Sequence, residues 1–238
     1  MIEFQNVSFS YEKGRPVLQE LSFRIETGEA VGLIGANGAG KSTVMKLLLG
    51  LLTGEGRILV DDLEVCKANL KQIRRKLGFV LQNSDNQMFM PTVYEDMMFG
   101  PLNYMMSREA AEKKVDEVLA RLGMTELKHR HNHKISGGEK RMAAIATVLA
   151  MEPEAVLMDE PTSALDPCNR RLVINTIRSL PQTKLITSHD LDMILDTCGR
   201  VILLSGGRIA ADGPAQEILR DQALLEAHRM ELPLRFQR

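Results

Sequence analysis

Hydrophobic and polar residues alternate along the first 25 residues, a pattern typical of strands with one buried face. The alternation is loose over residues 4–9 and strict over residues 21–25, and it ends at a Thr27-Gly28-Glu29 turn. Residues 30–34 are then continuously apolar, as in a short strand that is buried on both faces. The pattern predicts an N-terminal β region that leads into a strand of a buried sheet.

Helical periodicity replaces this alternation in the middle of the chain. Ser107 has the chemistry of a helix N-cap, and Gly123 stands where a C-cap glycine belongs. Between them, apolar residues recur at the spacing of one helix face: Ala111, Val115, Val118, Leu119 and Leu122. We therefore expect residues 83–145 to form a helical subdomain, inserted into a core that is made of residues 1–82 and 146–238.

Outside this insertion, short apolar runs alternate with amphipathic stretches. The predicted strands are residues 57–60, 77–81, 155–159, 184–187 and 201–204; the predicted helices are residues 42–52, 168–180, 190–197 and the tail from Ala215. Gly206-Gly207 predicts a hairpin turn. Strands that alternate with helices favour a parallel sheet with helices on its faces, so the expected fold class is α/β.

Charge and composition narrow the possible functions. The 238 residues carry 30 basic and 31 acidic side chains, a net charge of −1, so no basic stripe favours nucleic acid as a partner. The longest mainly apolar stretch, residues 142–151, is about half of the ~20 residues that a membrane-spanning helix needs. Cys66, Cys168 and Cys198 are far apart, which favours reduced thiols over a disulfide framework or a zinc site. We expect a globular domain of the cytosol.

Residues 35–42, Gly-Ala-Asn-Gly-Ala-Gly-Lys-Ser, match the P-loop pattern and stand between a predicted buried strand and a predicted helix. Glycines let successive backbone N–H groups turn inward around phosphate oxygens, and the start of the helix adds partial positive charge. Lys41 is expected to reach the β- and γ-phosphates, and the Ser42 hydroxyl to bind Mg²⁺. The candidate nucleotide-binding residues here are Gly35, Asn37, Gly38, Ala39, Gly40, Lys41, Ser42 and Thr43. This segment predicts binding of a nucleoside triphosphate.

A pair of acids follows the predicted strand 155–159. Asp159 ends that strand and is suited to hold Mg²⁺ through a water molecule. Glu160 beside it is suited to polarise an attacking water as a general base. Two adjacent acids after a strand often form only a polar loop, but together with the P-loop they predict the second half of a hydrolytic nucleotide site.

Further motifs stand in the order found in ATP-binding cassette (ABC) ATPases, and with the P-loop and the acids they extend from residue 2 to about residue 220. Residues 135–139, Ile-Ser-Gly-Gly-Glu, resemble the signature motif that is usually written Leu-Ser-Gly-Gly-Gln. The signature residues are Ser136, Gly137, Gly138 and Glu139, and the segment that resembles the D-loop is Ser163, Ala164, Leu165 and Asp166. Gln82 matches the Q-loop, His189 the switch histidine, and Tyr11 the aromatic residue that stacks on adenine.

The resemblance implies a P-loop NTPase fold of the ABC type, with a RecA-like parallel sheet, an antiparallel β subdomain and an inserted helical subdomain. It implies ATP hydrolysis with Mg²⁺, and it adds Gln82 to Ser42 and Asp159 as a metal ligand. It also implies that two chains, identical or paralogous, enclose two ATP molecules, so that each γ-phosphate meets one chain's P-loop and the other chain's Ser136. His189 would contact the γ-phosphate and orient the water with Glu160.

Residues 82–87, 91–93 and 99–103 are similar to the ATPase subunits of energy-coupling-factor importers, a group that includes the cobalt and nickel uptake ATPases. That group usually has proline where Ser84 stands, and glutamine is the common signature residue where Glu139 stands. The resemblance implies a peripheral subunit on the cytoplasmic face of the membrane, attached to separate transmembrane subunits that select the solute, for example cobalt, nickel or a vitamin. The alternative is an ABC-type ATPase that acts on DNA or ribosomes without transport; a P-loop kinase would have no use for the signature, the Q-loop or the switch histidine.

Methionines are concentrated after Gln82. Six of the 14 fall within residues 88–106. Because methionine is unbranched and polarizable, it suits an apolar surface that accepts a partner helix. We predict that some of Met88, Met90, Met97 and Met98 line an exposed groove for a helix of the membrane subunit; the alternative is that they fill the core of the helical subdomain.

Three histidines, His129, His131 and His133, lead into the signature motif. Imidazoles at close spacing can bind a metal ion. No carboxylate or cysteine completes a ligand set nearby, so a solvated polar loop is favoured.

Overall fold

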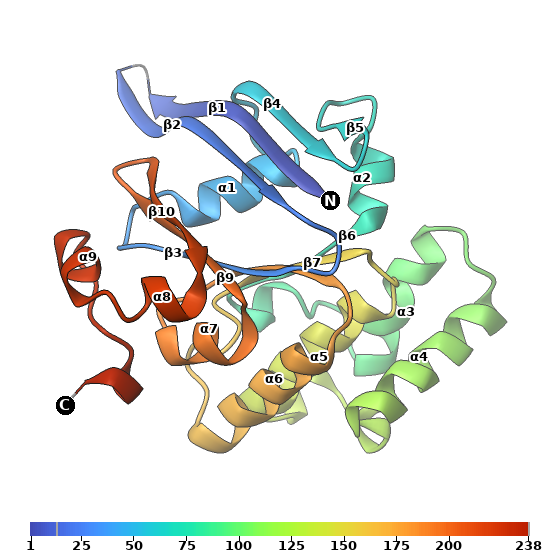
Figure 1. Cartoon of the computed structure of the whole chain (residues 1–238). Helices are drawn as coiled ribbons and strands as arrows, with labels where there is room; N and C mark the ends of the chain where they lie inside the picture. Colours follow the sequence, from blue (N-terminus) through green and yellow to red (C-terminus); the bar gives the residue numbers. More distant parts are fainter. Residues whose placement is uncertain (13, 238) are drawn as a thin grey trace.

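The computed structural model describes residues 1–12 and 14–237, which form two sheets with helices between and beside them (Figure 1). The smaller, antiparallel sheet has the strand order β2–β1–β4–β5. Its strands are β1 (Ile2–Glu12), β2 (Arg15–Ile25), β4 (Glu55–Val60) and β5 (Leu63–Glu64). The loose alternation near the N-terminus has a structural cause, because the register of β1 against β2 shifts between Phe4 and Val7, where Asn6 has a φ of 49°.

The larger sheet has the strand order β10–β9–β3–β8–β7–β6, with parallel pairing throughout except between β9 and β10. Its strands are β3 (Ala30–Ile34), β6 (Leu77–Val80), β7 (Ala155–Asp159), β8 (Thr183–Thr187), β9 (Arg200–Ser205) and β10 (Arg208–Pro214). The predicted hairpin at Gly206-Gly207 joins the two antiparallel strands, and both glycines have positive φ angles. The predicted α/β class with a parallel sheet is confirmed.

Helix α1 (Lys41–Leu48) lies between the two sheets (Figure 1). Its apolar side chains are buried in a core shared with β1, β2 and β3. The sequence predicted a helix to Leu52, and this is wrong by four residues. The helix stops because Gly50 takes a left-handed φ of 62° and its N–H bonds to the carbonyl of Leu47, which closes the last turn.

A second core lies on the opposite face of the larger sheet. The helices that contribute to it are α3 (Val93–Asn103), α4 (Arg108–Leu122), α5 (Gly137–Leu149), α6 (Pro167–Ser179), α7 (Leu191–Thr197), α8 (Ala215–Ile218) and α9 (Gln222–Ala227). Helix α4 has the predicted caps, since the Ser107 hydroxyl accepts from the amide of Ala110 and Gly123 has a φ of 67°. Helix α5 continues past the predicted subdomain boundary at residue 145 without a break.

The remaining helical segments are short. They are α2 (Leu70–Lys76) and the 3₁₀ turns η1 (Ser84–Asn86), η2 (Thr125–Leu127), η3 (Asn132–Lys134) and η4 (Leu234–Phe236). Within the described residues, no helix combines the length and apolar character needed to span a bilayer.

The predicted methionine groove is wrong for three of its four residues. Met88, Met97 and Met98 are at most 7% exposed and belong to the core of the helical region, while Met90 is half-buried. The reason is the position of α3, which packs against both α4 and α5, so that two adjacent positions on it face inward. A different set of apolar side chains is exposed near this segment, and it consists of Phe89, Phe99, Leu102 and Met105.

Candidate nucleotide site

The P-loop joins the end of β3 to the start of α1. A side chain at Gly35 would lie 2.2 Å from the carbonyl oxygen of Leu204, and one at Gly40, whose φ is 105°, would lie 2.7 Å from Leu18. These two positions therefore need glycine for close approach and for a left-handed backbone. No described side chain caps the start of α1, and uncapped amides at a helix start can bind phosphate.

Lys41 is folded into this loop. Its Nζ donates to the carbonyls of Gly35 at 2.7 Å and Ala36 at 3.2 Å, and the residue is only 8% exposed. Burial lowers the pKa of Lys41, and the nearby carboxylates of Glu160 and Asp159 oppose this shift. The ammonium of Lys41 can exchange these neutral carbonyls for a phosphate at little cost in free energy, because a negatively charged phosphate is the stronger acceptor.

The neighbouring P-loop residues have different surroundings. Ala39 and Thr43 are buried, whereas Asn37 and Gly38 are exposed at the loop tip. The hydroxyl of Tyr11 lies 3.3 Å from that of Thr43, and 56% of Tyr11 remains exposed beside the loop. The ring of Tyr11 packs edge to face against Phe9, with the ring centres 4.8 Å apart. The ring therefore remains accessible to a ligand. Its stacking on adenine remains a prediction.

Ser42 and Asp159 meet at the expected metal position. The Ser42 hydroxyl donates to Asp159 Oδ2 at 3.3 Å, and Asp159 Oδ1 accepts a very short hydrogen bond from Thr187 at the end of β8. A hydroxyl and a carboxylate oxygen at this separation fit Mg²⁺, which takes oxygen ligands and keeps several waters. Gln82, the third predicted ligand, is exposed two residues after β6 and makes no described side-chain hydrogen bond with either of them.

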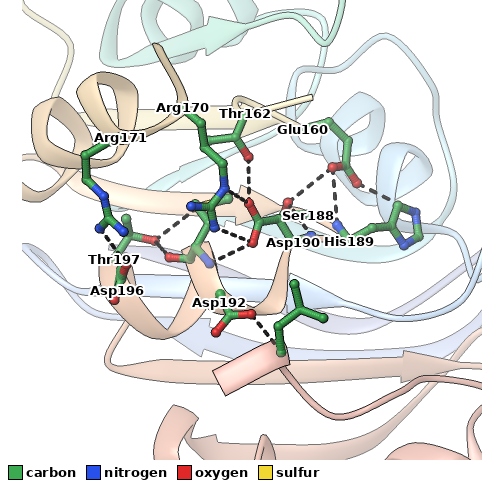
Figure 2. A network of polar contacts seen from close by, with 12 residues as sticks. Glu160, Thr162, Arg170, Arg171, Ser188, His189, Asp190, Asp192, Asp196 and Thr197 are labelled. Atoms are coloured by element: carbon green, nitrogen blue, oxygen red, sulfur yellow. Dashed lines mark hydrogen bonds and ion pairs between the residues drawn. The ribbon is translucent and has the colours of Figure 1, made fainter. Parts of the chain in front are cut away.

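The carboxylate of Glu160 faces the turn at Ser188 and His189, and Figure 2 shows contacts from both of its oxygens. Its Oε2 accepts from the Ser188 hydroxyl and from the His189 amide, both at 3.2 Å, while Oε1 is buried and has no hydrogen-bond partner among the described residues. The backbone of Glu160 has a φ of 48°, a conformation that a non-glycine residue seldom adopts. A buried carboxylate oxygen without a hydrogen bond is costly unless it has a ligand or a function, which suits a general base.

His189 stands between Glu160 and Lys41. Its Nε2 lies 3.6 Å from Glu160 Oε1 and 3.3 Å from Lys41 Nζ. The next residue, Asp190, caps α7 and forms a two-pronged pair with Arg170 of α6 at 2.5 and 2.8 Å (Figure 2). Although burial acts to raise the pKa of Asp190, the hydrogen bonds from Arg170 and from the Met193 amide hold it below its ordinary value. The pair fixes the helix that follows the histidine.

The signature residues lie at the start of α5. Ser136 is the N-cap and forms a capping box with Glu139, whose carboxylate accepts from the Ser136 amide at 2.7 Å while the Ser136 hydroxyl accepts from the Glu139 amide at 3.2 Å. The bond from the Ser136 backbone lowers the pKa of Glu139. Glutamate in place of the usual glutamine is thus explained, because a carboxylate is favoured at a helix N-terminus.

The D-loop segment lies against the signature segment. Asp166 caps α6, and a side chain at Gly138 would collide with Asn169 of that helix at 2.1 Å. A cleft of about 560 Å³ has Gln82, Gly137 and residues 163–165 among its walls, and no P-loop residue lines it. Among the described residues, the predicted site is therefore divided. One cluster consists of Lys41, Ser42, Asp159, Glu160 and His189. The signature segment, the D-loop segment and Gln82 lie around the separate cleft.

Several contacts of this region were not predicted. Arg170, Thr187 and Ser188 bind the predicted acids or the turn at His189, and their partners are too distant in sequence for any spacing to reveal. The histidines at 131 and 133 lie with ring centres 5.3 Å apart, as on a polar loop. Across residues 1–12 and 14–237, no three or more His, Cys, Asp or Glu side chains are grouped to hold a metal ion.

Comparison with known proteins agrees with this geometry. The family description "ABC transporter" matches residues 18–163. The energy-coupling factor transporter ATP-binding protein EcfA of Methanothermobacter thermautotrophicus is 41% identical over 98% of this chain and 77% of its own length.

Two solved structures extend the similarity to three dimensions. CbiO1 of Clostridium perfringens, described as part of the ABC transporter complex CbiONQ, has a TM-score of 0.84 at 32% identity, over 95% of this chain and 93% of its own. The ATP-binding cassette MJ0796, solved as a dimer in a post-hydrolysis state with ADP and phosphate, has a TM-score of 0.80 at 28% identity, over 90% and 99% of the two chains.

Proposed function

We propose that this chain, which belongs to the ABC transporter family and is an ATP-hydrolysing subunit of that family, drives an importer of the energy-coupling-factor type as part of a nucleotide-sandwich dimer. The observation that carries the proposal is the division of the site. One chain presents a phosphate and water-activating cluster around Lys41 and Glu160, and a separate anion-binding helix end at Ser136. The Lys41 cluster contains no signature residue, and the helix end at Ser136 contains no P-loop residue. Two chains in opposite orientation would therefore complete two sites.

The first cluster would bind and polarise the nucleotide. Amides of the P-loop and of the first turn of α1 would hold the phosphates, and Lys41 would turn from the Gly35 carbonyl to the γ-phosphate. Ser42 and Asp159 would hold Mg²⁺, joined by Gln82 when that side chain turns inward. When bound, the metal would neutralise charge that develops on the transferred phosphoryl oxygens.

Glu160 and His189 would then act on the attacking water. Glu160 Oε1 is the free acceptor that takes the water proton, and the bonds from Ser188 and the His189 amide to Oε2 hold the carboxylate in place. The imidazole of His189, 3.3 Å from Lys41 Nζ, stands where the γ-phosphate would bind and would hold the water and the phosphate in line. The partner's Ser136 and the N-terminus of its α5 would supply the remaining contacts to the γ-phosphate.

ATP would therefore hold two chains together until it is hydrolysed. Closure would assemble the two sites and loss of the γ-phosphate would release them, which converts chemistry into a movement of the subunits. This chain would be a peripheral subunit at the cytoplasmic face of the membrane. The solute, for which the sequence resemblance suggests cobalt, nickel or a vitamin, would be chosen by another subunit.

The exposed apolar patch formed by Phe89, Phe99, Leu102 and Met105 suits the membrane partner. Their exposed fractions are 62, 45, 38 and 90%, and the rings of Phe89 and Phe99 pack edge to face at 4.8 Å. The loop that carries Phe89 is fixed from beneath, since buried Asp96 accepts from the amides of Phe89 and Met90 at 3.1 Å. Large exposed aromatics on a fixed loop mark a protein interface. Because the loop follows the Gln82 segment, we assign the patch to a cytoplasmic helix of the membrane subunit.

Replacing Phe89 and Phe99 together with glutamate should detach the chain from its membrane partner. Two aromatic side chains that the partner would cover become charged, so affinity for the membrane subunit should fall at least about 30-fold, while ATP binding by the isolated chain stays unchanged. The measurement is co-purification of the tagged chain with its membrane subunits. Leu51→Glu is the control, because Leu51 is 59% exposed in the loop after α1. Full complex formation by the double variant would contradict the assignment of the patch, and a wild-type chain that never associates with a membrane protein would favour an ABC-type ATPase without transport.

A further inference from the structure

Arg141 is a buried cation without a carboxylate partner. It lies in α5, five residues after Ser136, and is 4% exposed. Its Nη1 donates to the carbonyl of Leu81 at 2.7 Å and its Nη2 donates a very short bond to the carbonyl of Gln82. Within the described part of the chain it forms no ion pair, and its buried Nε has no partner. Burial lowers the pKa of this guanidinium. Arginine is seldom buried unpaired, so the contact with Gln82 is a costly one to maintain.

Other bonds attach the same segment to the same helix. The side chain of Gln87 accepts from the Leu81 amide at 3.0 Å and donates to the Ala144 carbonyl of α5 at 2.7 Å. Lys140 of α5 forms an ion pair with Asp85 at 2.5 Å. Residues 81–87 are thus held to the signature helix by contacts at both of their ends and in their middle.

We propose that Arg141 is a positioning residue that transmits the position of Gln82 at one nucleotide to Ser136, which serves the nucleotide of the partner chain. The inference rests on the proposed sandwich dimer and adds to it the residue that links its two sites. When Gln82 moves toward a γ-phosphate and its metal, the two carbonyls gripped by the guanidinium move α5 with them. Ser136, at the N-terminus of that helix, moves as well.

The chemistry of the contact suits this role. A guanidinium is planar and offers its two terminal nitrogens to two successive carbonyls at once, which fixes orientation as well as distance. The single nitrogen of a lysine can donate to two carbonyls but lacks the fixed planar fork of a guanidinium, and an apolar side chain could bind neither carbonyl. The cleft that separates Gln82 from the D-loop also has Arg141 in its wall, so water could reach the two carbonyls if the guanidinium were removed.

The chain contains a matched control. Lys184 of β8 is also a buried cation, 5% exposed, and its Nζ donates to two carbonyls, those of Leu180 and Gln182, at 2.6 and 3.2 Å. Burial lowers its pKa too. Arg141→Met and Lys184→Met therefore remove the same kind of group from the same kind of surroundings, and only the first releases the Gln82 segment. Each replacement leaves two backbone carbonyls without their donor, so the two variants should lose a similar amount of stability.

The test compares both variants with the wild type as full chains in their complex. For Arg141→Met we expect kcat and ATP-driven dimerisation each to fall about tenfold, within roughly 3- to 30-fold, while the affinity of the isolated chain for ATP stays within about twofold, since the P-loop is untouched. Lys184→Met should match the wild type in all three. A folded Arg141→Met variant with wild-type kcat would overturn the proposal, as would an equal loss in Lys184→Met.

A double-mutant cycle with Gln82→Ala separates transmission from a general structural role. If Arg141 acts through the Gln82 segment, the double variant should be no more than about twofold slower than the slower single variant. Losses that multiply would contradict the proposal. Should Arg141→Met fail to fold, Arg141→Lys replaces it in both experiments, with an expected loss of the same sign and a wild-type kcat as the contradicting result. A wild-type chain that does not dimerise with ATP would instead contradict the proposed function itself.

Discussion

Replacing Glu160 with glutamine should lower the rate of ATP hydrolysis by about 10²- to 10⁴-fold, the usual effect of losing a general base, while ATP binding is retained. The amide keeps an oxygen that can accept from Ser188 and from the His189 amide, so the side chain can stay in place. It cannot take a proton at the position of Oε1, the buried oxygen that is free in the described structure. Phosphate release at saturating ATP measures the effect.

The same variant should also accumulate as a dimer with ATP. If closure persists until hydrolysis, a chain that binds ATP without hydrolysing it stays closed, and sedimentation with and without ATP should show the difference. Glu154→Gln is the control. Glu154 lies just before β7, the strand that leads to Glu160, and its carboxylate pairs with Lys76 on the surface. Hydrolysis by Glu160→Gln at close to the wild-type rate would remove Glu160 from the role of base.

Replacing Lys41 with alanine should weaken nucleotide binding itself, by roughly 30-fold or more, the scale of losing one partner of a buried charge contact. Lys41 is the buried cation of the P-loop, and without phosphate its ammonium contacts the Gly35 and Ala36 carbonyls and Nε2 of His189. ATP titration of the isolated chain, followed by calorimetry, measures the loss.

The control for this effect lies on the same helix. Lys46 is an exposed residue of the last turn of α1, and Lys46→Ala should leave ATP affinity within about twofold of the wild type, as an exposed charge contributes little. Equal affinity for ATP in Lys41→Ala and the wild type would mean that the nucleotide does not bind at the P-loop.

The parts of the site that are local in sequence could be predicted. The P-loop is one strand, one glycine-rich turn and one helix start, so its residue types and their spacing determine its geometry. The acids at 159 and 160 follow an apolar strand, and parallel pairing of β7 with β8 brings them beside Thr187 and Ser188. The order of the strands in the sheet, by contrast, depends on pairings between segments far apart in the chain.

The methionine prediction was wrong for three of its four residues because composition does not say which face a residue occupies. Met97 and Met98 are adjacent on α3, and both are buried because that helix has neighbours on two sides. The aromatic residues at 89 and 99, in the same part of the chain, are exposed. The way α4 and α5 pack against α3 determines which of its apolar side chains are buried and which are exposed.

The contacts of Arg141 and Arg170 could not be predicted for a different reason. Each arginine meets a partner that is 20 or more residues away, across a connection between elements. A sequence gives the charge of these residues and the helix on which each lies, but the acceptors of Arg141 are backbone carbonyls, which every residue has. The order of residue types therefore does not show that Arg141 contacts the carbonyl of Gln82 rather than that of another residue.

The central claim is that each nucleotide site is shared between two chains, and mixing two inactive variants tests it most directly. Lys41→Ala removes the P-loop half of the site and Ser136→Arg blocks the signature half, so each homodimer is inactive. A mixed dimer has one site with both halves intact and one with neither, and random mixing should restore about a quarter of the wild-type rate of ATP hydrolysis, because half of the dimers are mixed and each has one working site of two. Two different affinity tags would isolate the mixed dimers. Recovered hydrolysis in that fraction is the result expected, and a fraction that contains both chains yet stays as inactive as either parent would contradict a shared site.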